Sequence, residues 1–230
     1  MSQATRVCLI RHGQTAWNAA TRVQGHLDIG LDATGQAQAE RLGAALADEG
    51  LDAIYSSDLA RAHSTALAVA RRLGLAVQTD TRLRERAFGR FEGLTHADIA
   101  QRWPEAAARW RQRDPDFAAE GGGESLLQLH ARCVPAAAEL AARHAGQCIA
   151  LVAHGGVLDA LYRAATGLPP QAPRTWQLGN ASVNRLLWNG EGFVLVGWDD
   201  AAHLTGLHVP DLPGPPAARD GADAPPLHQA

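Results

Sequence analysis

Two apolar stretches of the chain each end in a histidine. Residues 7–10 lead into Arg11 and His12, and residues 148–153 lead into His154. A neutral imidazole can attack phosphorus and later depart, which divides one difficult transfer into two easier steps. A neighbouring guanidinium can hold phosphoryl oxygens through parallel hydrogen bonds. These residue types indicate phosphoryl transfer with His12 as the nucleophile, although a polar strand terminus is the plainer interpretation of an isolated Arg-His-Gly.

Arg61 and Glu85 are candidates for the same chemistry. Arg61 comes in the first turn of an amphipathic run over residues 59–73, where free N–H groups and the helix dipole favour an anion. Glu85 lies in residues 83–93, an alternation of charged, aromatic and glycine residues that we interpret as an irregular loop over the strand ends. Alternatively, Arg61 is a surface arginine and Glu85 belongs to a structural ion-pair network.

The elements expected to position these residues alternate between strand and helix. This order makes the main sheet largely parallel and places helices on both of its faces. We therefore predict an α/β protein, a three-layer α/β/α sandwich in which the strand ends share one rim and His12, His154, Arg61 and Glu85 converge there. The predicted strands are residues 7–10, 53–56, 76–79, 148–153, 182–188 and 193–198, the last two as an antiparallel hairpin, and the predicted helices are residues 34–49, 59–73, 95–103, 104–112, 125–144 and 157–166.

The chain is long enough for one substantial core, because it has 230 residues. We predict a single domain over residues 1–204, in which residues 86–123 form a small helical lid. Six of the twelve prolines fall in residues 205–230, where there is little apolar patterning. That segment is predicted to be a disordered Pro/Ala-rich tail.

Composition excludes several classes of function. A net charge of -3 and a pI near 6.3 offer no basic field for nucleic acid. No run approaches the roughly 18 apolar residues of a membrane span, and no secretory segment precedes the first strand, so we expect a cytoplasmic protein.

All 21 basic residues are arginine, which excludes a P-loop lysine or a Schiff-base lysine. Cys8, Cys133 and Cys148 suit buried thiols better than a disulfide or zinc framework.

Six ordered motifs run through the chain at compatible spacing. The first reads Leu-Ile-Arg-His-Gly-Gln-Thr-x-x-Asn over residues 9–18, and the others are residues 56–62 with Thr65, 83–93, 122–125, 152–156 and 180–182. This series resembles the histidine phosphatase superfamily, in its phosphoglycerate mutase-like branch, over essentially residues 5–200. The resemblance implies a phosphoglycerate mutase-like fold.

The resemblance also implies a role for each matching residue. His12 would become the phosphohistidine. Glu85 would be the general acid that protonates the leaving alkoxide and then accepts a proton from water. A protonated His154 and two guanidiniums would stabilise the transferring group without a metal or other cofactor. The residues that would bind the phosphoryl group or lie near the substrate are Arg11, Arg61, His154, Asn18, Gln24, Gly25 and Gly155.

Two reactions fit these roles, because the phosphohistidine can meet either water or a second hydroxyl group of the substrate. The segment between Glu85 and His154 is shorter than in the mutases that the chain resembles, and Phe88 stands where those mutases carry a tyrosine. Both features favour hydrolysis of a small phosphomonoester, with mutase-type transfer as the alternative. The lid arginines Arg109, Arg111 and Arg113 either recognise a substrate carboxylate or form a solvated helix face.

An alternative of another class is a catalytically silent interaction module on the same fold. The intact set of candidate residues argues against it. A nucleotide-binding oxidoreductase is set aside, because no strand is followed by Gly-x-Gly-x-x-Gly. The oligomeric state stays open, with a homodimer as one option. No metal site is expected, because the spacing of the four residues that might suggest a cluster fits no standard ligand pattern: His26, Asp28, His63 and His96.

Overall fold

The computed structural model describes residues 3–207, so the predicted tail lies outside the described residues from residue 208 onward. Its centre is a six-stranded sheet in the order β3-β2-β4-β1-β5-β6. The first four of these strands pair in parallel, whereas β5 and β6 are antiparallel, so the predicted mostly parallel α/β sheet is confirmed. The strands are β1 (Thr5–Arg11), β2 (Ala53–Ser56), β3 (Val77–Thr79), β4 (Cys148–Ala153), β5 (Val183–Trp188) and β6 (Phe193–Asp200).

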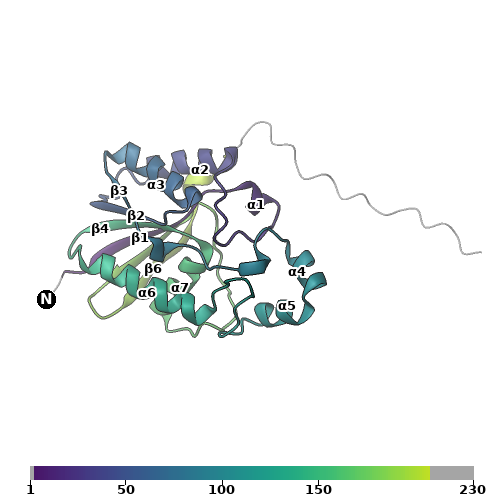
Figure 1. Ribbon diagram of the computed structural model, residues 1–230. Coiled ribbons are helices and arrows are strands. Elements are labelled where there is room, and N and C mark those ends of the chain that lie inside the picture. Colours follow the sequence, from purple (N-terminus) through teal and green to yellow (C-terminus); the bar gives the residue numbers. More distant parts are fainter. Residues whose placement is uncertain (1–2, 208–230) are drawn as a thin grey trace, which may run out of the picture.

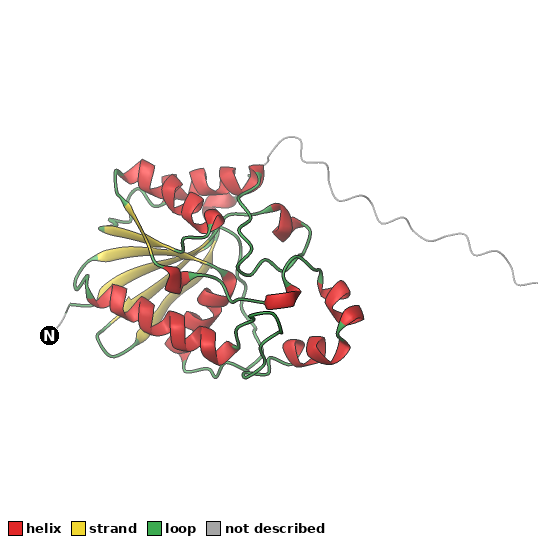
Figure 2. Ribbon diagram, in the orientation of Figure 1, coloured by secondary structure: helices red, strands yellow, loops and turns green. Residues whose placement is uncertain are grey.

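Helices cover both faces of the sheet, which gives the three predicted layers (Figures 1 and 2). The helices α2 (Ala33–Ala45) and α3 (Ala60–Leu73) pack on one face, and α6 (Leu126–Ala142) and α7 (Gly155–Thr166) pack on the other. Alternate residues of β1 supply the two cores, since Leu9 contacts the α6–α7 side and Ile10 the α2–α3 side. All six residues of β4 are buried, as expected for a strand that is covered on both faces.

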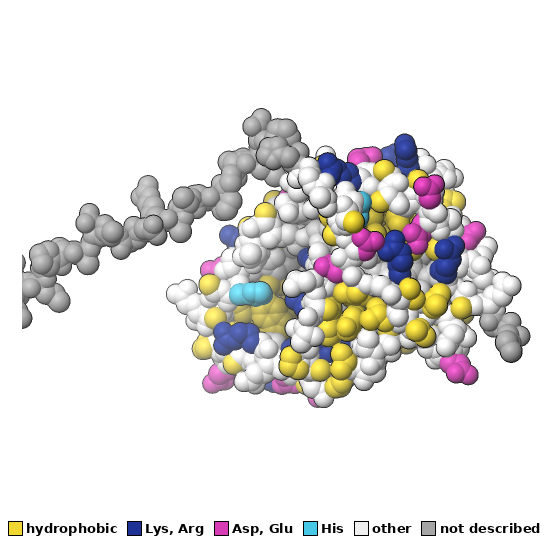
Figure 3. Space-filling view, turned by 180° about the vertical axis from the view of Figure 1, so that it is seen from behind, with side chains coloured by type: hydrophobic (Ala, Val, Ile, Leu, Met, Phe, Trp, Pro, Cys, Tyr) yellow, Lys and Arg dark blue, Asp and Glu magenta, His cyan; other side chains and the backbone are white. Residues whose placement is uncertain are grey.

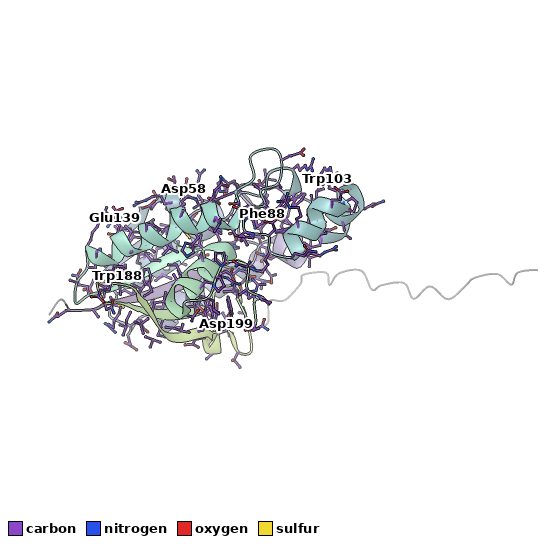
Figure 4. All side chains as sticks on the ribbon, turned by 90° about the horizontal axis from the view of Figure 1, so that it is seen from below. Asp58, Phe88, Trp103, Glu139, Trp188 and Asp199 are labelled. Atoms are coloured by element: carbon purple, nitrogen blue, oxygen red, sulfur yellow. The ribbon has the colours of Figure 1, made fainter. Side chains whose placement is uncertain are left out.

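The segment over residues 86–123 has a small core of its own at one end of the molecule, around the short helices α4 (His96–Arg102) and α5 (Pro104–Arg111) (Figure 1). Phe91, Ile99 and Phe117 form this core. Two of the aromatic side chains at this end, Phe88 and Trp103, are labelled in Figure 4, well away from Glu139 on α6. Three 3-10 turns complete the described elements: Thr81–Leu83, Gly89–Phe91 and Ala202–Leu204.

Some boundaries differ from the prediction. A one-turn helix, α1 (Ala16–Ala19), interrupts the predicted loop after the first strand, because Thr15 and Asn18 form a capping box. The helix α2 ends at Ala45, before Gly50. Asp58, which precedes Leu59 at the start of α3, does not cap this helix. The Asp58 carboxylate is bound by Arg84 at 2.5 and 2.7 Å, and the first N–H group of α3 donates instead to Asp28.

Acidic and basic side chains are interspersed over the face seen from behind, with apolar side chains among them (Figure 3). This mixture agrees with the small net charge of -3. Within residues 3–207, no helix combines the length and apolarity needed to cross a bilayer.

Candidate active site

The pairing of β1 with β4 brings the two strand-end histidines together. In this parallel pair Arg11 lies opposite Ala153, so the next residue of each strand leaves the sheet at the same level. The rings of His12 and His154 are 5.1 Å apart between centroids. Both side chains are almost completely buried, with exposed fractions of 3% and 0%. The sheet therefore places two imidazoles side by side at the rim where α/β proteins bind ligands.

His12 presents one nitrogen to a cavity of about 370 Å³. Its Nδ1 lies 2.7 Å from the carbonyl oxygen of Gly13, which can only accept, so Nδ1 carries the proton. In the neutral ring Nε2 is then the unprotonated nitrogen. Burial, followed by the charges of Arg61 and Arg11, holds the pKa of His12 well below 6.5. His12 is accordingly a neutral imidazole with a free lone pair at neutral pH, the form that a nucleophile requires.

The ring of His154 lies beside that of His12 and is completely buried. Its Nε2 is 2.8 Å from the hydroxyl oxygen of Ser57. Burial, then the charges of Arg61, His12 and Arg11, lower the pKa of His154 well below 6.5. In the protein without a bound anion His154 is therefore neutral, because positive or potentially positive groups surround a ring that is shielded from water. The protonated form expected during phosphoryl transfer stays a prediction.

Two arginines flank the histidines in the cavity wall. Arg61 is completely buried, and its terminal nitrogens donate to the carbonyl oxygens of Leu27 and Gly25 at 3.0 and 2.7 Å. Arg11 donates to the carbonyl oxygen of Leu178. Burial is the main cause that lowers the pKa of both guanidiniums. These cations are held in a site of low polarity, where their interaction with an anion is stronger than in water.

Three buried nitrogen atoms at this site lack a hydrogen-bond partner among residues 3–207: Nε of Arg11, Nε of Arg61 and Nδ1 of His154. An unsatisfied buried polar group costs about 1–3 kcal/mol. The two guanidinium nitrogens carry N–H groups that a bound oxyanion would satisfy, and His154 Nδ1 would join them in the tautomer whose Nε2 accepts from the Ser57 hydroxyl group. The site is thus built for an anion.

Glu85 reaches the same cavity from its loop. Its carboxylate accepts hydrogen bonds from the backbone N–H groups of Gly156, at 3.0 Å, and Arg86, at 2.8 Å. A Cβ atom placed on Gly155 would lie 3.8 Å from both Glu85 Oε2 and Arg11 Nε. The Glu85 carboxylate and the Arg11 guanidinium therefore lie close to each other at the N-terminus of α7. A side chain larger than glycine at position 155 would extend between them.

The remaining predicted residues line the cavity as well. Asn18 Oδ1 accepts from the N–H and hydroxyl groups of Thr15, at 3.0 Å each, which leaves the amide N–H₂ group of Asn18 as a donor. Gln24 accepts from the Thr15 hydroxyl at 3.0 Å. Gly25 has a φ of +55°, and a Cβ atom there would lie 2.1 Å from Glu92, so this position requires glycine.

Only one of the three arginines considered on the lid segment lines the cavity. Arg113 lines the cavity, whereas Arg109 pairs with Asp114 outside it and Arg111 is exposed. Sequence reasoning missed other lining residues. Three are arginines, Arg22, Arg86 and Arg174, and others are aromatic: Trp17, Phe88 and Trp110. Their types were visible in the sequence, but most of them stand in irregular segments, and Trp17 and Trp110 lie on short helices whose orientation depends on the fold.

No cluster of three or more His, Cys, Asp or Glu side chains suited to a metal ion occurs among residues 3–207. Of the four residues considered for one, His26 donates its Nε2–H to the Glu85 backbone oxygen at 2.7 Å, and Asp28 caps α3. The functional atoms of the site are instead one free imidazole nitrogen, a neighbouring carboxylate and several cationic donors. Such a set can attack, stabilise and release a phosphoryl group.

Comparisons with known proteins agree with this chemistry. The model of the histidine phosphatase superfamily (branch 1) matches residues 7–201. Phosphoglycerate mutase-like protein 4 of Arabidopsis thaliana is 39% identical over 201 residues, 86% of either chain. The metal-independent phosphoserine phosphatase of the same plant is 37% identical over 90% of this chain and 86% of its own. The native structure of mycobacterial glucosyl-3-phosphoglycerate phosphatase is 38% identical, covers 86% of this chain and 100% of its own, and has a TM-score of 0.78.

Proposed function

Because the chain belongs to branch 1 of the histidine phosphatase superfamily, we propose that it is a metal-independent phosphatase that hydrolyses a small phosphomonoester through a phosphohistidine on His12. Its relatives include phosphatases that are named for small phosphate esters. The observation that carries the proposal is the neutral His12 ring beside the buried, unpaired Nε–H groups of Arg11 and Arg61. This arrangement combines a nucleophile with donors for phosphoryl oxygens.

In the first step the Nε2 lone pair of His12 attacks phosphorus in line, and the bond from phosphorus to the ester oxygen breaks. Arg11 and Arg61 stabilise the charge on the transferring phosphoryl oxygens. Glu85, in its protonated form, gives its proton to the leaving alkoxide. The amide N–H₂ group of Asn18 supplies a further donor. His154, neutral in the free protein, binds the phosphoryl group through a ring N–H.

In the second step water attacks the phosphohistidine. Glu85, now a carboxylate, takes the proton of the water, and inorganic phosphate leaves with the electron pair returned to His12. The cavity of about 370 Å³ exceeds the space that one phosphoryl group needs, so it also admits the alcohol portion of a small ester and the attacking water. The segment over residues 86–123 closes one side of the cavity and acts as its lid.

The low pKa of His12 predicts an unusual pH dependence. Since the pKa of His12 lies well below 6.5, the nucleophile stays neutral as the pH falls through 6.5. We expect kcat/KM, corrected for ionisation of the substrate phosphate, to show no decline with a midpoint near 6.5. Initial rates across a buffered pH series measure this. A decline at that midpoint would show that His12 titrates as it does in water.

The central experiment is phosphate release from a panel of small phosphomonoesters, with and without a chelating agent. Turnover that resists the chelator supports the proposal. A mutase would instead interconvert phosphoglycerate isomers when a bisphosphorylated primer is present and would release little phosphate. If neither activity occurs on any ester, a silent interaction module on this fold becomes the better interpretation.

A further inference from the structure

Glu92 is a half-buried residue of the lid segment that takes no part in the proposed chemical steps. Its carboxylate accepts three backbone N–H groups, those of Phe88 at 2.9 Å, His26 at 3.1 Å and Leu27 at 3.2 Å. Among residues 3–207, the N–H groups of Phe88 and His26 have no other acceptor. One side chain therefore joins the start of the lid segment to a loop around His26, which is 66 positions from Glu92 in the sequence.

The loop that Glu92 binds also holds the phosphate site. The carbonyl oxygens of Gly25 and Leu27 accept from the two terminal nitrogens of Arg61, at 2.7 and 3.0 Å. These two bonds fix the plane of the Arg61 guanidinium, whose Nε–H group is buried and unpaired. Glu92 binds the N–H groups of His26 and Leu27 in the same short stretch of backbone. The direction from which Arg61 meets a phosphoryl oxygen therefore depends on backbone that Glu92 holds in place.

The carboxylate lies directly against the backbone of this loop. A Cβ atom on Gly25 would be 2.1 Å from Glu92 Oε1, so the close approach requires glycine. Burial lowers the pKa of Arg61, and the charges of nearby carboxylates, Glu92 among them, oppose this change. Glu92 is thus close enough to affect the phosphate site both through its hydrogen bonds and through its charge. The two effects have opposite signs, because a negative charge repels an incoming phosphate.

The proposed general acid touches the same loop but has a second anchor. The carbonyl oxygen of Glu85 accepts from His26 Nε2 at 2.7 Å and from Arg132 Nη2 at 3.2 Å. Arg132 lies on α6, so this anchor does not involve Glu92. Loss of the Glu92 carboxylate should therefore disturb Arg61 more than it disturbs the proton donor.

From these contacts we propose that Glu92 is a positioning residue, which orients the Arg61 guanidinium toward the phosphoryl group by fixing the loop over residues 25–27. An ionised carboxylate suits this task, because both of its oxygens only accept and together can hold several N–H groups. Glu92 favours phosphate binding through these hydrogen bonds and in spite of its charge. The inference rests on the proposed phosphatase activity, since it adds a residue to the same site.

Calorimetry with inorganic phosphate separates the hydrogen bonds of Glu92 from its charge. Glu92→Gln removes the charge and turns one acceptor into an N–H₂ group, so a role through charge alone predicts tighter binding. We expect about 10-fold weaker binding instead, because Arg61 loses its fixed direction. Glu92→Asp keeps the charge but is one methylene shorter, and it should also weaken binding. Glu105→Gln, exposed on α5, removes the same charge and should leave binding unchanged.

A double-mutant cycle shows whether Glu92 acts through Arg61. Arg61→Ala should weaken phosphate binding, and Glu92→Gln should weaken it no further in that background, whereas independent residues give additive losses. Additive losses, or binding to both Glu92 variants that matches or exceeds that of wild type, overturn the role of Glu92. Ester hydrolysis by wild type then leaves the phosphatase assignment standing. If no ester is hydrolysed but the binding differences persist, the role of Glu92 stands and the phosphatase assignment fails.

Discussion

Replacing His12 by alanine is expected to lower kcat/KM for phosphomonoesters by about four orders of magnitude or more, because the nucleophile and its covalent route are lost together. The free Nε2 of His12 is the one that would carry the phosphoryl group. Wild type, mixed with a ³²P-labelled ester and quenched in alkali, should therefore yield a labelled protein. The label should be stable to alkali, labile to acid and located on the peptide that contains His12. His12→Ala should take up no label.

A matched variant distinguishes loss of chemistry from loss of fold. His63 lies on α3, half-buried and outside the cavity, so His63→Ala should keep both turnover and label. Because the His12 ring is 3% exposed, its removal leaves a small cavity, and thermal unfolding of both variants measures the cost. Label on His12→Ala at the wild-type level would place the covalent intermediate elsewhere and overturn the mechanism.

The sequence could predict most elements because their apolar patterns are local. Residues 148–153 form an unbroken apolar run and are buried on both faces, and Gly74 ends its helix in the left-handed conformation that favours glycine. Where the structure differs from the predicted start of a helix, a residue that is distant in the sequence is the cause. Asp58 was free to cap α3 in the sequence, but Arg84 binds it in the fold and Asp28 takes its place.

The candidate site was predictable in composition but not in arrangement. The motifs predicted His12 and His154 as site residues. The 5.1 Å between their ring centroids, however, depends on the pairing of β4 with β1, and the order of strands in a sheet cannot be read from a local sequence pattern. The low pKa of His154 likewise depends on which charges surround it. Arg174 carried no signal, because it stands in the irregular connection between α7 and β5, which is held by packing of Trp176 on Tyr162 of α7 rather than by a local pattern.

Replacing Glu85 by glutamine should separate the two chemical steps. Glutamine keeps an oxygen that can accept from the N–H groups of Gly156 and Arg86, but it cannot supply or accept the reacting proton. For an alkyl phosphate we expect kcat to fall about 10²–10⁴-fold, the usual contribution of general acid–base catalysis. p-Nitrophenyl phosphate has a leaving group that needs no proton, so phosphorylation of His12 should continue. The attack of water then lacks its base, and the ³²P-labelled phosphohistidine should accumulate above the wild-type level.

Glu120→Gln is the matched control, since Glu120 lies in the same segment but pairs with Arg90 outside the cavity. It should leave both esters and the amount of label unchanged. The rates at which the two esters phosphorylate His12 in Glu85→Gln, together with the amount of phosphoenzyme, decide the role of the carboxylate. If Glu85 is the proton donor, phosphorylation slows more with the alkyl phosphate than with p-nitrophenyl phosphate, and excess phosphoenzyme forms. If the carboxylate only fixes the N-terminus of α7, phosphorylation slows equally with both esters and no excess phosphoenzyme forms, which would require another residue as the acid.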